Sequence, residues 1–314
     1  MRLPVPARSL SSALLAAILA TGFASSCATT YDEKLGTKLE KQATAEETDK
    51  ATALVAEGDA LWKERGDAEK LKAGLAKWEE AVKLAPSAEL TAKLARGHYL
   101  LGDGHYGVAD RAEERDAEYE AGLNWANEAL KLSAPEYAAA KAAGQKHAEA
   151  IKLAPKEAVP AMYWYASNLG KWAASKGFAT RLKYKDDLKA TMDQVKALDE
   201  GFFYAAVWRY LGGYEAATAG IAGGSLDKSK ENFEKSIALA PNYLGTRVLF
   251  ADYLCPKLQK DADGDGQPDG KVLFKKLLDE VLAADPAADP EIEPENRIEQ
   301  TKAKKLLARI DELF

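Results

Sequence analysis

The side chains best suited to chemistry form an acidic loop near the C-terminus. In Asp261-Ala-Asp263-Gly-Asp265-Gly-Gln267-Pro-Asp269, acids occupy positions 1, 3, 5 and 9 of a calcium loop, and glycine occupies position 6. Calcium prefers oxygen ligands, and Gln267 would offer its backbone carbonyl. We therefore expect a weak, structural Ca²⁺ site formed by Asp261, Asp263, Asp265, Gln267 and Asp269.

One position of this loop departs from the calcium-binding pattern. Val272 stands where the pattern has a bidentate glutamate, and the next acid, Asp279, lies too far along the chain to replace it. The alternative interpretation is a hydrophilic turn between two helices. No other cofactor is expected.

The remaining reactive side chains do not form a catalytic pattern. Three histidines and two cysteines are too few for zinc chemistry or a Cys/His pair. His98 and His105 are separated by Gly102-Asp-Gly104, which interrupts a helix, and Cys255 lies in an apolar stretch typical of a buried thiol. The sequence contains no nucleophile elbow, phosphate loop or zinc-protease motif. We therefore predict that the protein is not an enzyme.

Composition narrows the class of protein further. Of the 314 residues, 47% are apolar and 29% are charged, which is enough to build a hydrophobic core. The net charge of −6 argues against a nucleic-acid partner, because phosphate contacts need a basic surface. Alanine is abundant and β-branched runs are absent, so an all-α fold is expected.

The N-terminus is typical of an exported protein. Basic Arg2 and Arg8 precede an apolar run over residues 10–23 that is too short to cross a membrane. Residues 1–26 are therefore interpreted as a signal peptide.

The end of this leader resembles a bacterial lipobox, because small residues stand directly before Cys27. We predict lipidation of Cys27, with ordinary cleavage and a free thiol as the alternative. Ala28, in place of an aspartate, favours the outer membrane, with the protein facing the periplasm. Residues 27–50 are rich in Thr, Lys and Glu, and we interpret them as the lipidated N-terminus and a flexible tether.

The body of the chain repeats two short patterns. A proline-terminated pattern occurs at residues 80–86, 149–155 and 235–241, and Trp208-x-x-Leu211-Gly212 gives the second. Together they predict the two helices of a tetratricopeptide (TPR) repeat, although the spacing is irregular. We expect one domain over residues 51–314, an irregular TPR-like right-handed solenoid of about ten to twelve helices.

Aromatic residues are concentrated between residues 163 and 210. So many neighbouring aromatics cannot all face one core, and an apolar pocket between helices is the usual ligand site in such a fold. The candidate cavity residues are Tyr163, Trp164, Trp172, Phe202, Tyr204 and Trp208.

Several segments resemble one known family in the right order. Tyr163-Trp-Tyr-Ala-Ser-Asn-Leu-Gly-Lys-Trp172, the segment 233–253 and the closing stretch 296–314 are similar to segments of the TRAP transporter T-component (TatT) family. The resemblance covers roughly residues 50–314, and the acidic loop is not part of it.

This resemblance implies a periplasmic lipoprotein that assembles as a homotrimer, with an apolar cavity in each subunit. It also implies a solute-binding protein of a TRAP system as partner and a hydrophobic or amphipathic small molecule as cargo. The alternative function is a TPR-like scaffold that holds envelope proteins together without a small ligand.

Overall fold

The computed structural model describes residues 28–31, 39, 42–220, 222–262 and 266–314. Within these ranges the protein has fourteen α-helices and no β-strand, which confirms the all-α prediction. The first seven are α1 (Ala45–Trp62), α2 (Ala68–Leu84), α3 (Ala88–Leu100), α4 (Ala112–Ser133), α5 (Pro135–Ala142), α6 (His147–Ala150) and α7 (Val159–Ser175). The others are α8 (Phe178–Leu198), α9 (Phe202–Thr218), α10 (Leu226–Leu239), α11 (Gly245–Tyr253), α12 (Asp269–Ala283), α13 (Glu293–Leu307) and α14 (Ile310–Leu313).

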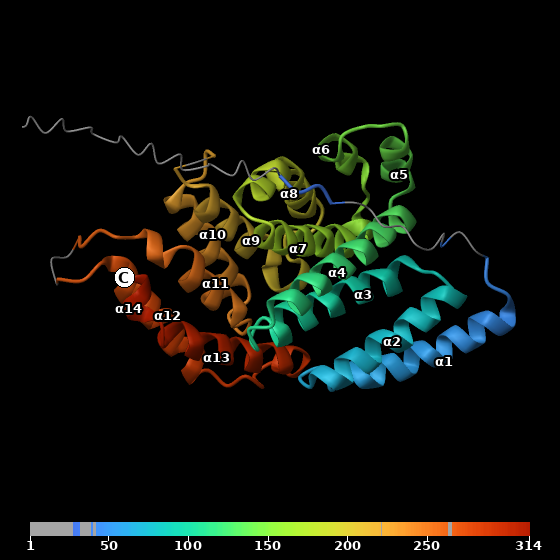
Figure 1. The fold of residues 1–314 in the computed structure, drawn as a ribbon, viewed down its shortest axis with the longest axis horizontal. Helices are drawn as coiled ribbons and strands as arrows, with labels where there is room; N and C mark the ends of the chain where they lie inside the picture. The colour runs from blue at the N-terminus through green and yellow to red at the C-terminus, as the bar shows by residue number, and fades with distance from the viewer. Residues whose placement is uncertain (1–27, 32–38, 40–41, 221, 263–265) are drawn as a thin grey trace, which may run out of the picture.

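Consecutive helices pack side by side in pairs, as the repeat pattern predicts. The pairs are α1 with α2, α3 with α4, α7 with α8, α9 with α10 and α11 with α12 (Figure 1). Helices α6 and α14 have only four residues each, which accounts for a count above the predicted ten to twelve. A one-turn-long π-helical segment, η1 (Leu101–Tyr106), continues α3.

Glycines in mid-helix mark the closest contacts within two pairs. A Cβ added at Gly58 of α1 would lie 2.4 Å from the Trp78 ring of α2, and one at Gly212 of α9 would lie 2.8 Å from the Phe233 ring of α10. Both aromatic rings are fully buried. The absence of a side chain at these two glycines therefore lets the paired helices approach closely.

One of the proline-terminated patterns folds differently from the others. The copies at 80–86 and 235–241 end the long helices α2 and α10. The copy at 149–155 lies instead in the four-residue helix α6 and a following 3₁₀ turn, Ile151–Leu153. Pro155 again follows a helical segment, but that segment is short. Gly144, with φ +86°, interrupts the chain just upstream, so no long amphipathic helix precedes this proline.

The two ends of the array meet. Glu295 on α13 forms a buried ion pair with Arg65, at the turn between α1 and α2, with 2.8 Å between carboxylate and guanidinium. Arg96 of α3 binds the same carboxylate at 3.0 Å. Figure 1 shows α13, in red, returning to the end of the α1–α2 hairpin. The helices thus enclose an interior space.

Residues 28–31, which belong to the segment predicted as a flexible tether, contact the helices. The backbone N–H of Thr29 donates to Thr180 Oγ1 at 3.0 Å, and that of Tyr31 donates to the Tyr184 hydroxyl at 2.7 Å. The Tyr31 ring packs edge-on against Trp172 of α7. Residues 28–31 therefore lie along the N-terminal half of α8, and α1 begins at Ala45.

Candidate ligand cavity

A cavity of about 920 Å³ lies in the interior enclosed by this arrangement. Its walls come from α3, η1, α4, α7, α8, α9, α11 and α13, which are far apart in sequence. This volume is in the range of ligand-binding cavities, about 300–1,000 Å³.

Aromatic side chains form one wall of the cavity. The Trp164 ring contacts those of Tyr99 and Phe203, with centroids 5.6 and 5.1 Å apart, and all three residues line the space. Tyr163 and Tyr243 extend the wall. The α7 residues are positioned by buried Asn168, whose amide donates to the Ala95 carbonyl of α3 at 3.2 Å. This wall offers a large apolar surface to a ligand.

The start of α9 has an unusual backbone. Phe203, Tyr204 and Ala205 have φ of 44°, 58° and 54°, a left-handed turn of three non-glycine residues. Each such residue costs roughly 1–2 kcal/mol. Arg209 compensates by donating to the Tyr204 carbonyl at 2.9 Å and to the Phe203 carbonyl at 3.1 Å. The turn places the Phe203 ring in the cavity wall.

Arg209 itself is a buried cation that lines the cavity. Its guanidinium donates to the Tyr163 hydroxyl at 3.3 Å and lies 4.1 Å from the centre of the Tyr243 ring. Only 3% of the residue is exposed, and within the described part of the chain no carboxylate pairs with it. A buried charge without a counter-ion is costly, so this site favours an anionic ligand group.

A second polar cluster crosses the cavity beside the aromatic wall. Asp103 of η1 pairs with Lys171 of α7 at 2.7 Å and with Lys302 of α13 at 2.6 Å. Burial alone would raise the pKa of Asp103, but the two ammonium groups outweigh it and hold that pKa well below its ordinary value. Glu299 also pairs with Lys302, at 2.8 Å, so two carboxylates balance two ammonium groups and this cluster mainly ties the three elements together.

Comparison with known families identifies a match for most of the chain. The sequence profile of the TRAP transporter T-component family matches residues 91–314, more than two thirds of the chain. The chain belongs to the TRAP transporter T-component family. The match begins within α3, so the α1–α2 hairpin lies outside it. No curated protein matches the sequence.

This T-component brings together only some of the predicted cavity residues. Tyr163 and Trp164 line the cavity. Trp172 packs between Tyr31 and Tyr184, and Trp208 lies on another face of α9, with the ammonium of Lys235 3.6 Å from its ring centre.

The other two predicted residues, Phe202 and Tyr204, do not line the cavity but pack against aromatic residues that do. Phe202 packs on Tyr163 at 5.6 Å, and Tyr204 stacks on Tyr243 at 5.4 Å, measured between ring centroids. Residues on one helix point in different directions, so some of the clustered aromatic residues line the cavity and others pack in the hydrophobic core.

Sequence reasoning missed Arg209, Asp103, Lys171 and Lys302. Arg209 had a usable signal, because it is the single charge in the apolar segment 201–214. The other three had none, because only the folding of η1, α7 and α13 around one space brings them together.

Of the five predicted calcium ligands, the structure describes three. Asp261 Oδ2 accepts the Gly266 N–H at 3.0 Å, and Asp269 Oδ1 accepts the Ala262 N–H at 3.1 Å, so both carboxylates support the loop itself. Asp263 and Asp265 lie outside the described residues, as does Cys27. In the described part of the chain no three acidic, His or Cys side chains converge as a metal site would require. Calcium binding stays a prediction, and a fall of the melting temperature on chelation would support it.

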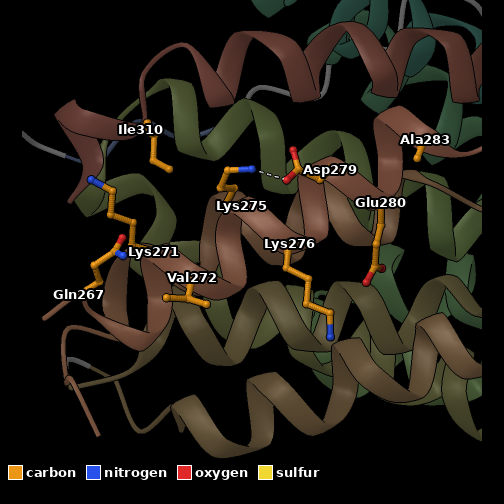
Figure 2. Close-up of a pocket in the computed structure, with 9 residues that line it drawn as sticks. All are labelled: Gln267, Lys271, Val272, Lys275, Lys276, Asp279, Glu280, Ala283 and Ile310. Atoms are coloured by element: carbon orange, nitrogen blue, oxygen red, sulfur yellow. Dashed lines mark hydrogen bonds and ion pairs between the residues drawn. The ribbon is translucent and has the colours of Figure 1, made fainter. Parts of the chain in front are cut away.

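A shallow groove of about 670 Å³ runs along α12, next to this loop (Figure 2). Its lining contains Lys271, Lys275 and Lys276, followed along the helix by Asp279 and Glu280, and Lys275 pairs with Asp279 at 2.5 Å. Pairs at i,i+4 are typical of a solvated helix face. The interior cavity is therefore the better candidate site.

Proposed function

We propose that this protein is a lipid-anchored, periplasmic accessory component of a TRAP-type transport system that binds an amphipathic, anionic small molecule in its interior cavity. The proposed partner is a solute-binding protein, with which this protein would exchange the molecule. The observation that carries the proposal is the aromatic cavity of about 920 Å³.

The cavity suits a molecule with an apolar body. Burying apolar surface contributes about 25 cal/mol per Å², and the rings of Tyr99, Trp164 and Phe203 offer such a surface in one place. These aromatic side chains come from three helices, so the site exists only in the folded array.

An acidic group on the same molecule would pair with Arg209. A carboxylate or phosphate would supply the counter-ion that this buried guanidinium lacks in the described structure, and charge-assisted hydrogen bonds are about twice as strong as neutral ones. The hydrogen bonds to Phe203 and Tyr204 fix the orientation of the guanidinium in advance.

The cell-envelope part of the proposal rests on the sequence. The signal peptide and the lipobox-like Cys27 support an anchor in the outer membrane, and the homotrimer remains a proposal from the family resemblance. No helix among the described residues is long and apolar enough to cross a membrane.

A scaffold without a ligand is the second candidate function. It predicts an interior filled by side chains, and the large cavity favours ligand binding instead. The two functions differ in what aromatic substitutions should do.

The test compares Trp164→Ala with Trp208→Ala in protein purified gently from its own membrane. Trp164 lines the cavity and Trp208 does not, although both are buried. Both variants should lose stability, by about 3–5 kcal/mol. Only Trp164→Ala should also lose the small molecule detected by mass spectrometry of an organic extract. Equal retention in both variants would show that the molecule does not bind at the Trp164 wall, and wild-type protein that carries no small molecule would favour the scaffold.

A further inference from the structure

A carboxylate without a counter-ion lies in another part of the cavity wall. Asp252 of α11 lines the cavity and is exposed rather than packed in the core. No described residue forms a hydrogen bond or an ion pair with its side chain. Asp252 also stands in the last turn of α11, where the partial negative charge of the helix end disfavours a carboxylate. A cation bound at this place would remove both costs.

The charged groups around Asp252 are already paired with one another. The charged side chains that act most strongly on Asp252 are Lys171, Asp103, Lys302 and Arg309. Both lysines belong to the cluster that Asp103 and Glu299 balance. Arg309 pairs with Glu312 at 2.9 Å. The carboxylate of Asp252 is therefore a surplus negative charge beside that cluster.

The surroundings of Asp252 also make its charge costly. Although the residue is exposed to the cavity, the cavity walls exclude part of the bulk water, and this desolvation raises the pKa of the carboxyl above its ordinary value. Lys171 acts in the opposite direction but does not outweigh desolvation. The carboxylate would thus gain from a partner that enters with the ligand.

Tyrosine side chains line the cavity between Asp252 and Arg209. Tyr253 packs against α9, Tyr210 packs against α7, and both line the cavity. Burial raises the pKa of Tyr210, and the nearby hydroxyls of Tyr253 and Tyr163 raise it further. A row of tyrosines therefore connects Asp252 with Tyr163, the hydrogen-bond partner of Arg209. The faces of such rings attract organic cations.

We propose that the molecule bound in the cavity is a zwitterion, whose organic ammonium group binds at Asp252 and whose anionic group binds at Arg209. The two side chains line one cavity from α11 and α9, with tyrosines between them. A hydrocarbon acid would leave Asp252 without a partner, so the cavity should discriminate against it. This inference rests on the proposed function, because it assigns a second group of the same ligand.

Three probes of equal chain length test the proposal on the full mature protein, stripped of bound molecules. Aminododecanoate with its amine at the far end carries both charges, dodecanoate carries only the anion, and dodecylamine carries only the cation. Isothermal titration calorimetry of the dissolved monomers measures their dissociation constants. We expect the amino acid to bind about tenfold more tightly than either other probe. A parallel set built on octanoate covers a shorter separation of the two charges.

Asp252→Asn removes the charge and keeps the size of the side chain. This variant should bind the amino acid about tenfold more weakly and dodecanoate unchanged. Asp279→Asn is the matched control, since Asp279 lies on α12 and outside the cavity lining. Circular dichroism checks that both variants fold.

The outcomes separate this inference from the proposed function. Equal binding of the amino acid and of dodecanoate, in the wild-type protein and in Asp252→Asn, would overturn the cation site and leave the anion site at Arg209 intact. Tight binding of dodecylamine alone, lost in Asp252→Asn, would overturn the zwitterion and the anion site together. A protein that binds no probe of either length would overturn both proposals.

Discussion

At the scale of the residue, the proposed binding of an anionic group depends on Arg209. Its guanidinium is buried among Tyr163, Tyr243 and the carbonyls of the left-handed turn, with no carboxylate from the described chain. The same residue therefore supports a strained backbone and presents a charge. This double use gives a physical reason for a cation in the otherwise apolar segment 201–214.

Replacing this cation tests its role as an anion site. Arg209→Leu should lower the amount of bound small molecule at least tenfold, because a hydrogen bond to a charged group contributes about 1.5–3 kcal/mol. Extraction and mass spectrometry measure the bound fraction, and circular dichroism checks the fold. Arg247→Leu is the control, since Arg247 pairs with Glu280 outside the cavity. If both arginine variants kept the ligand equally, Arg209 would not be its anion site.

His98 gives a prediction for the dependence of stability on pH. Burial alone would lower its pKa, but Glu118 at 2.6 Å and Glu79 at 3.3 Å outweigh burial and raise the pKa above its ordinary value. The stabilisation is therefore complete below about pH 6.5 and is lost as the pH rises through the raised pKa. His98→Gln should remove this loss in urea unfolding measured between pH 6 and 9.

His147 provides a control of the opposite sign. Burial lowers its pKa to about 3, so its effect on stability appears as a loss when the pH falls below about 6.5. His147→Gln should leave the slope between pH 7 and 9 unchanged. A change of that slope in His147→Gln, but not in His98→Gln, would refute the assignment.

At the scale of the element, the helix pairs follow from local patterns. Gly212 faces Phe233 at a distance that leaves no room for a Cβ, whereas its neighbour Gly213 has 3.7 Å to the nearest atom, in Tyr253. Gly212→Ala should therefore destabilise the protein by about 1–3 kcal/mol. Gly213→Ala should be neutral or stabilising by up to about 1 kcal/mol, because alanine favours the helix. Equal effects in thermal unfolding would contradict this packing.

The same patterns explain what could be predicted from sequence. The helix ends before Pro86 and Pro241 depend on local sequence, so the spacing of the proline-terminated pattern was enough to locate them. The left-handed turn at 203–205 carries no glycine and gave no signal. Its conformation depends on Arg209, one helical turn further along, and on the aromatic surroundings.

At the scale of the whole molecule, α13 completes the cavity wall and is held in place by ion pairs with the first hairpin, α3 and η1. Glu295 binds Arg65 and Arg96, and Lys302 binds Asp103, so α13 is held to residues 199 to 230 positions away in the sequence. No repeat pattern contains this information, which is why Tyr163 and Trp164 could be proposed as cavity residues but Trp172 and Trp208 could not be set apart from them.

The central claim is that this enclosed space holds a small molecule. Native mass spectrometry of the protein, extracted gently from its own membrane, tests it directly, and the same spectrum reports acylation and subunit number. The account predicts an acylated chain that carries a removable small-molecule adduct, with about one adduct per subunit. An acylated chain without any adduct, unchanged when lipid extract from the same membrane is added back, would contradict it.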